Sequence, residues 1–221
     1  MAWTEFALAF AAFFATHAIP VRPPVRPWLV ARLGSGGFGA AYSALSLAVL
    51  AWLIGAAGRA PHVPLWDWAP WQNHVVLTVM LPVCVILALA IARPNPFSFG
   101  GAHNDRFDPA RPGIVQLTRH PLLLALTLWA GAHLLANGDL AHVMLFGTFA
   151  GFALLGRSLI DRRKRREMGD DWQRLLAAVA AAPRLSRLGA GDTVARLLAG
   201  STLYVLLIWG HPVLFGVSPL P

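Results

Sequence analysis

Six apolar segments follow one another along this chain, separated by short polar or proline-containing stretches. Each is about 16 to 21 residues long, and a helix of that length roughly spans the hydrocarbon core of a membrane. Inside hydrocarbon, backbone N–H and C=O groups need partners within their own segment, which favours helices. The sequence therefore predicts an all-α, polytopic transmembrane helical bundle of about six spans. The expected spans are residues 3–19, 38–57, 72–92, 118–136, 140–160 and 194–209.

The composition leaves little room for a soluble part, because 57% of residues are hydrophobic and 13% are charged. We therefore predict one integral-membrane domain over residues 1–221. The formal charge of +8 does not indicate nucleic-acid binding, because the basic residues flank apolar segments. Of the 18 Lys and Arg residues, 17 fall in or beside the first, third and fifth loops, and only Arg59 falls on the other side. The positive-inside rule then predicts periplasmic termini and a multi-pass protein of the bacterial inner membrane.

The fourth apolar segment contains candidate functional residues, because Arg119-His120-Pro121 stands at its start and His133 near its end. Polar groups within spans are costly, so those that remain are functional candidates. His17 and His74 join this set, while the single cysteine, Cys84, excludes a disulfide or a multi-cysteine metal site. Apart from Glu5 near the outer end of the first span, no carboxylate is expected mid-membrane to pair with these histidines. Such a set suits axial ligation of a haem better than a zinc site or proton pumping.

Depth along the predicted spans limits which histidines can share a cofactor. The 13 residues between His120 and His133 correspond to roughly 20 Å along a helix, and the two side chains point to nearly opposite faces. One cofactor cannot be bound by both. The predicted depths favour His17 with His120, or His133 with His74 or His211.

Several motifs together identify a resemblance that covers nearly the whole chain. They are the early His17 before a Pro/Arg loop, the Ala60–Trp66 loop, Arg119-His120-Pro121, the Trp129–Asp139 run, Asp161-Arg162-Arg163 and the terminal His211–Pro219 stretch. In these features the chain resembles the NnrU family of membrane proteins. The Trp129–Asp139 run is the most specific of them.

The resemblance implies two functional associations. Bacterial members are linked to nitrite and nitric oxide reduction, and the plant relative, 15-cis-zeta-carotene isomerase, is a membrane haem b enzyme that converts a cis double bond to trans. It implies His17 and His133 as axial ligands, with His120 also required, so we predict a catalytic role for His120 and the adjacent Arg119. The depth argument separates His17 from His133, so the pairing stays open. Also implied are an apolar, carotenoid-like substrate within the lipid and a redox partner; the sequence leaves the oligomeric state open.

Two alternatives remain at this point. One is a non-enzymatic membrane accessory protein for a nitrogen-oxide reductase, in which the histidines are structural. The other follows from a more distant similarity to isoprenylcysteine carboxyl methyltransferases, whose Arg-His-Pro motif helps to hold S-adenosylmethionine. In those enzymes a tyrosine follows the motif, whereas this chain has Leu122.

Overall fold

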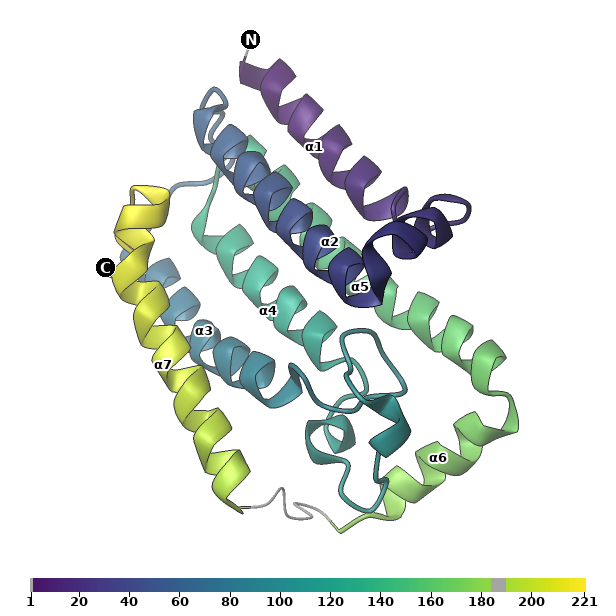
Figure 1. Cartoon of the computed structure of the whole chain (residues 1–221). Helices are drawn as coiled ribbons and strands as arrows, with labels where there is room; N and C mark the ends of the chain where they lie inside the picture. Colours follow the sequence, from purple (N-terminus) through teal and green to yellow (C-terminus); the bar gives the residue numbers. More distant parts are fainter. Residues whose placement is uncertain (1, 184–189) are drawn as a thin grey trace. The chain divides into compact units, whose positions relative to one another are not determined.

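A computed structural model describes residues 2–183 and 190–221, and over these residues the fold is all-helical, without strands (Figure 1). The helices are α1 (Ala2–Ala18), α2 (Val25–Arg59), α3 (Pro70–Ala90), α4 (Pro121–Ala136), α5 (Leu140–Met168), α6 (Asp170–Ala181) and α7 (Ala190–Phe215), with 3-10 turns η1 (Asn104–Arg106) and η2 (Gly113–Gln116). Each of the six predicted spans coincides with a helix, so the all-α class is confirmed. Among the described residues, α2, α3, α5 and α7 are long and apolar enough to cross a membrane, whereas α1 has 17 residues and α4 has 16. The total of six spans and the periplasmic termini stay predictions.

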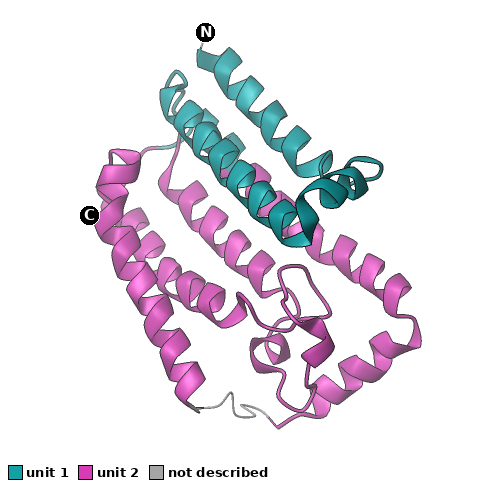
Figure 2. Ribbon diagram, in the orientation of Figure 1, with its two compact units in different colours: residues 1–66, 139–145 teal, residues 67–138, 146–221 magenta. Residues whose placement is uncertain are grey.

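The chain forms two compact units, which Figure 2 colours separately. Unit 1 comprises residues 1–66 and 139–145, and unit 2 comprises residues 67–138 and 146–221. The expectation of a single domain over residues 1–221 stays a prediction.

Unit 1 consists mainly of α1 packed along α2. Near the end of α2, Arg59 Nη2 donates to Glu5 Oε1 at 2.6 Å, and Trp52 Nε1 donates to the same oxygen at 3.3 Å. The second helix was predicted to begin at residue 38, but it begins at Val25 and bends at Gly34, where φ is +71°. Glycine tolerates that positive φ, so the helical turns continue on both sides of the bend.

In unit 2, α3 packs against both α4 and α7 (Figure 1). The buried Gln72 side chain donates to the Leu135 carbonyl at 3.0 Å, and Tyr204 donates to the Leu77 carbonyl at 3.0 Å. The backbones of α3 and α7 approach closely at Gly200, where an added Cβ would lie 2.8 Å from Val85 Cα. The Gly147-x-x-x-Gly151 pattern predicts a small-residue face for close helix contact, either within the chain or with a second copy. A Cβ at either position would meet nothing within 4 Å, so these glycines make no close contact among the described residues.

The last two long helices extend beyond their predicted ends. The basic run after residue 160 was expected to stop the fifth helix, yet α5 continues to Met168 and ends at Gly169, whose φ is +56°. Arg and Lys favour helices, and the exposed Glu167 carboxylate pairs with Lys164 at 2.9 Å. The change from apolar to basic residues after residue 160 therefore does not end α5. The seventh helix likewise runs to Phe215.

Helix α6 packs on the segment between α3 and α4. Trp172 and Val179 are buried against Phe97 and Val115, with the Phe97 and Trp172 ring centroids 5.3 Å apart. The sequence predicted an amphipathic surface helix here, and its apolar face covers protein. The polar, proline-containing segment 93–113 predicts a solvated loop for His103, Asp105 and Asp108, and all three are exposed. Asn95, Phe97 and Ser98 of the same segment are buried.

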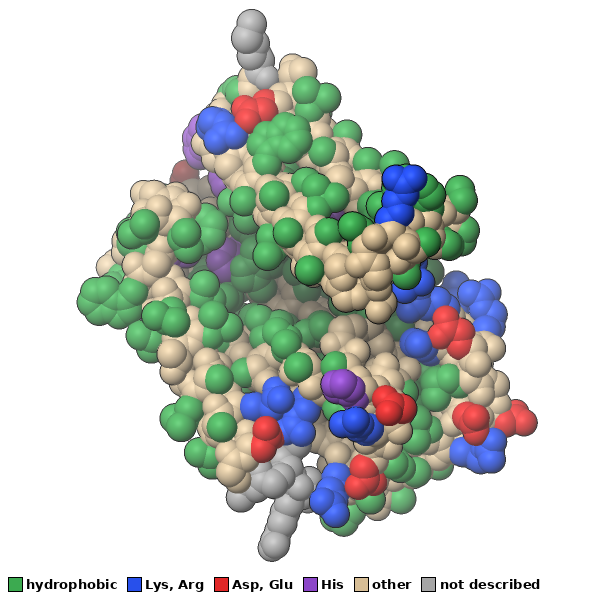
Figure 3. Space-filling model, in the orientation of Figure 1, with side chains coloured by type: hydrophobic (Ala, Val, Ile, Leu, Met, Phe, Trp, Pro, Cys, Tyr) green, Lys and Arg blue, Asp and Glu red, His purple; other side chains and the backbone are tan. Residues whose placement is uncertain are grey.

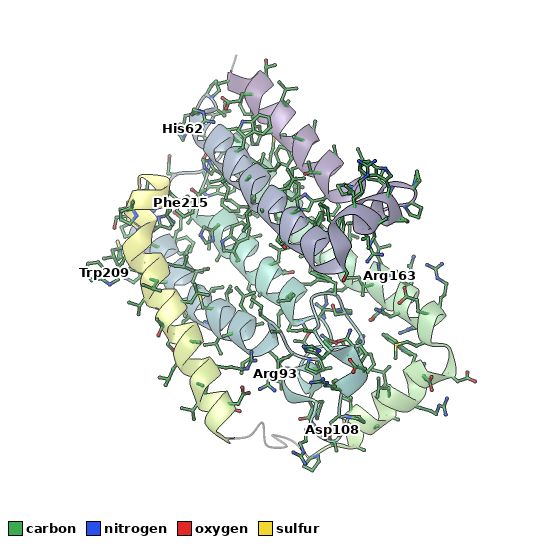
Figure 4. The ribbon with its side chains drawn as sticks, in the orientation of Figure 1. His62, Arg93, Asp108, Arg163, Trp209 and Phe215 are labelled. Carbon is green, nitrogen blue, oxygen red and sulfur yellow. The ribbon has the colours of Figure 1, made fainter. Side chains whose placement is uncertain are left out.

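Exposed apolar side chains cover the flank formed by α7. Leu206, Trp209 and Val213 are 62%, 78% and 87% exposed. In Figure 3 this flank shows hydrophobic and uncharged side chains over most of its length, and Trp209 points outward from α7 in Figure 4. Such a surface suits contact with lipid.

Candidate functional site

His120 is fixed at the start of α4, where Pro121 is the first helical residue and His120 is the N-cap. Its side chain is almost fully buried and uses both ring nitrogens. Nε2 lies 2.9 Å from Asp161 Oδ1, and Nδ1 lies 3.0 Å from Ser98 Oγ. Because an ionised carboxylate only accepts hydrogen bonds, Nε2 carries the proton, and Nδ1 accepts from the Ser98 hydroxyl.

Asp161 joins the two residues for which a catalytic role was predicted. Its Oδ2 accepts a hydrogen bond from Arg119 Nη2 at 2.8 Å while Oδ1 accepts from His120. The Asn95 side chain donates to the Arg119 carbonyl at 3.0 Å and ties the buried loop to this point. The sequence marks Asp161 only as part of the Asp161-Arg162-Arg163 motif, at the start of a basic run typical of a membrane anchor, and does not predict it as a partner of His120. The available signal was an acidic residue directly before five basic residues, because a basic anchor does not need a carboxylate.

The surroundings keep His120 neutral near pH 7. Burial lowers the pKa of His120 from its ordinary value of 6.5, and the neighbouring Asp161 carboxylate partly opposes this change. Ser98, His120 and Asp161 are linked in the manner of an acyl-transfer triad, but Ser98 is only 3% exposed and cannot meet a substrate there. With both ring nitrogens bonded to protein, His120 is suited to hold the start of α4 against α5.

The other predicted histidines share a different arrangement. In each, Nδ1 bonds the carbonyl oxygen of the residue four positions earlier, at 2.7 Å for His17, 2.9 Å for His74 and 2.8 Å for His133. A carbonyl only accepts, so Nδ1 carries the proton and Nε2 presents a lone pair. No residue in the described part of the chain hydrogen-bonds these Nε2 atoms. A neutral imidazole with Nδ1–H bound to a carbonyl is the form that ligates metals.

His133 has the most elaborate surroundings of the three. Its ring lies 5.4 Å from the Trp129 ring and 5.2 Å from the Phe146 ring, measured between centroids. Trp129 in turn packs against Phe149 at 5.8 Å. The Asn137 side chain donates to the His133 carbonyl at 2.7 Å and secures the end of α4. The most specific run of the sequence thus fixes one histidine within an aromatic wall.

Within unit 2, the candidate histidines lie at the two ends of α4. His120 precedes the helix and His133 lies in its last turn, roughly 20 Å apart along the axis. The hydrogen bond between Gln72 and Leu135 sets the start of α3 beside the end of α4, so His74 and His133 share one end of unit 2. His211 is close enough to His133 to interact with it electrostatically. His17 belongs to unit 1.

No three His, Cys, Asp or Glu side chains converge to hold a metal ion within residues 2–183 and 190–221. A haem differs from such a site, because its porphyrin supplies four ligands and the protein supplies at most two. The lone-pair geometry at His133 and the apolar aromatic wall beside it fit a haem. The bonded nitrogens of His120 do not fit an axial ligand.

Comparison with known families finds a match to the family described as NnrU protein, over residues 5–219. Comparison with curated proteins and with solved structures finds no match.

Proposed function

The chain belongs to the NnrU family, and from this premise we propose that it is an integral membrane haem b protein with His133 as an axial ligand. One observation carries the proposal: the His133 ring donates Nδ1–H to the Trp129 carbonyl at 2.8 Å, which leaves Nε2 unprotonated and without a hydrogen-bond partner among the described residues. The aromatic side chains around it supply the apolar contact that a porphyrin needs.

The second axial position has two candidates with the same protonation state. His74 lies at the same end of unit 2 as His133, and His17 presents its Nε2 in the same way within unit 1. We propose one of them as the second ligand. His120 and Arg119 are proposed as positioning residues that hold α4 through Asp161.

For the activity, we propose cis–trans isomerisation of an apolar, conjugated polyene, with support of nitrite or nitric oxide reduction as the second candidate. When bound, haem iron supplies electron transfer and a coordination position for such chemistry. The chain's own part is to exclude water from the iron with the Trp129 and Phe146 rings. Its exposed apolar helices would admit a substrate from the lipid.

The test is the absorption spectrum of the protein expressed with ample haem and purified in detergent. We expect a Soret band in the wild type, its loss in His133→Ala, and partial recovery when imidazole is added to that variant. His62→Ala is the matched control, because His62 lies exposed in the loop after α2 (Figure 4). Spectra of His17→Ala and His74→Ala identify the second ligand. A colourless wild type, or a His133→Ala variant with an unchanged band, would refute the haem proposal.

Further assays separate the alternatives. Haem-loaded protein incubated with a cis polyene should convert it to the trans isomer, as followed by chromatography. A red protein that leaves the polyene unchanged would favour the second candidate, support of nitrite or nitric oxide reduction. A colourless protein that does not bind S-adenosylmethionine would support the accessory role, in which the histidines are structural. Binding of S-adenosylmethionine by a colourless protein would support the methyltransferase alternative.

A further inference from the structure

A cavity of about 390 Å³ opens beside the start of α4 in unit 2. Its lining is divided by chemistry. Arg119, His120 and Arg157 contribute polar groups, while Leu124, Leu176 and Val179 contribute an apolar wall. The cavity therefore offers cationic nitrogen atoms and hydrocarbon contact to the same ligand.

The positive charge around this cavity is not balanced by the protein. The single Asp161 carboxylate is shared by Arg119 and His120, one on each oxygen. Arg157 makes no hydrogen bond or ion pair with any residue that the structure describes, although it is close enough to His120 to interact with it electrostatically. Arg119 bonds Asp161 through Nη2, and its side chain is 40% exposed. The Arg157 guanidinium thus remains without an acidic partner among the described residues, and Arg119 shares its partner with His120.

A guanidinium without an acidic partner attracts an anion, so a ligand that supplies oxygen acceptors is favoured. Guanidinium groups match the oxygen atoms of phosphate in a two-pronged geometry. A free phosphate ion would use only the cationic part and leave the leucine and valine wall in contact with water. A phosphate joined to a hydrocarbon chain uses both parts.

We propose that this cavity binds the phosphate headgroup of an anionic lipid, with Arg119 and Arg157 at the phosphate and the start of the hydrocarbon chain along Leu124 and Val179. The position suits such a ligand, because α4 is apolar from Pro121 onward and the basic run of α5 lies one to three turns beyond Arg157. Anionic headgroups gather where basic residues meet the membrane surface. The site lies at the opposite end of α4 from His133.

Full-length protein in detergent can be titrated with dioleoyl phosphatidylglycerol, with dioleoyl phosphatidylcholine or with inorganic phosphate, and lipid adducts counted by native mass spectrometry. We expect phosphatidylglycerol to bind and the other two to bind at least tenfold more weakly. Arg157→Gln should reduce phosphatidylglycerol binding by tenfold or more. Arg163→Gln is the matched control, since Arg163 is on the same helix (Figure 4) and pairs with Glu167 at 3.4 Å; it should change binding less than twofold.

Arg157→Gln should also fold normally, because Arg157 has no hydrogen-bond or ion-pair partner among the described residues that the substitution would remove. Its unfolding temperature without lipid is therefore expected to equal that of the wild type. Arg157→Lys keeps the charge without the planar fork and should bind with intermediate affinity. Equal loss of binding in the Arg157 and Arg163 glutamine variants, equal binding of phosphatidylcholine, or equal binding of inorganic phosphate would each overturn the proposal. None of these measurements requires haem, so the haem proposal and this one can fail separately.

Discussion

Replacing Asp161 by alanine should destabilise unit 2 more than any other single loss of a carboxylate on α5. The substitution removes the acceptor for His120 Nε2–H and for Arg119 Nη2 together. Hydrogen bonds to charged groups contribute about 1.5 to 3 kcal/mol, and the His120 side chain, only 3% exposed, cannot turn to water instead. The Arg119 side chain is 40% exposed, so its share is about 0.5 kcal/mol. The expected loss of unfolding free energy is therefore about 3 kcal/mol.

The chain contains its own reporter for this measurement. Cys84 is the only cysteine and is fully buried, so a thiol-reactive fluorophore should label it when unit 2 unfolds. For a chain of this size, about 3 kcal/mol corresponds to a fall in unfolding temperature of roughly 6 to 12 °C. Asp161→Asn keeps one acceptor oxygen and should lie between Asp161→Ala and the wild type.

Glu167→Ala provides the control on the same helix. Glu167 pairs with Arg163 and Lys164 at the surface, so its removal should cost about 0.5 kcal/mol and roughly 2 °C or less. An unfolding temperature of Asp161→Ala within 2 °C of the wild type would show that the Asp161 hydrogen bonds to Arg119 and His120 do not hold α4 against α5.

Two further outcomes are expected with the same assay. Gly200→Ala would place a Cβ 2.8 Å from Val85 Cα, and the resulting separation of α3 and α7 should lower the unfolding free energy by about 1 to 3 kcal/mol. Gly147→Ala is the control, because a Cβ there meets nothing within 4 Å and should not lower stability. Equal effects of the two substitutions would contradict the close packing at Gly200. Because burial lowers the pKa of His120, the unfolded state binds a proton at a higher pH than the folded state does. The contribution of neutral His120 to the unfolding free energy should then be complete above pH 6.5 and decline as the pH falls below that value. The unfolding free energy of His120→Gln should fall less over the same pH range. An identical fall in wild type and variant would assign the effect to other groups.

Most of the helical architecture follows from local sequence. Long apolar segments favour helices in a membrane wherever their neighbours lie, and all six predicted segments are helical. Pro121 marks the start of α4 because the first helical residue needs no N–H partner. The helix ends were harder to predict, since basic residues after a span favour a continuing helix as readily as a loop.

Part of the candidate site can also be predicted from local sequence. The sequence by itself predicts His17, His74, Arg119, His120 and His133 as candidate site residues, because polar residues stand out within apolar segments. It also separated His120 from His133, because helical rise fixes their spacing on one element.

Only the tertiary structure decided what each histidine contacts. The partner of His120 is Asp161, 41 positions away on another helix, and no local pattern encodes that pairing. The Nδ1 bond of His133 to Trp129 is local, yet the sequence alone cannot say whether its Nε2 atom is left without a partner. The cause is general: backbone geometry sets which residues share a helix face, whereas protonation state and charge balance depend on residues that folding brings together from distant positions.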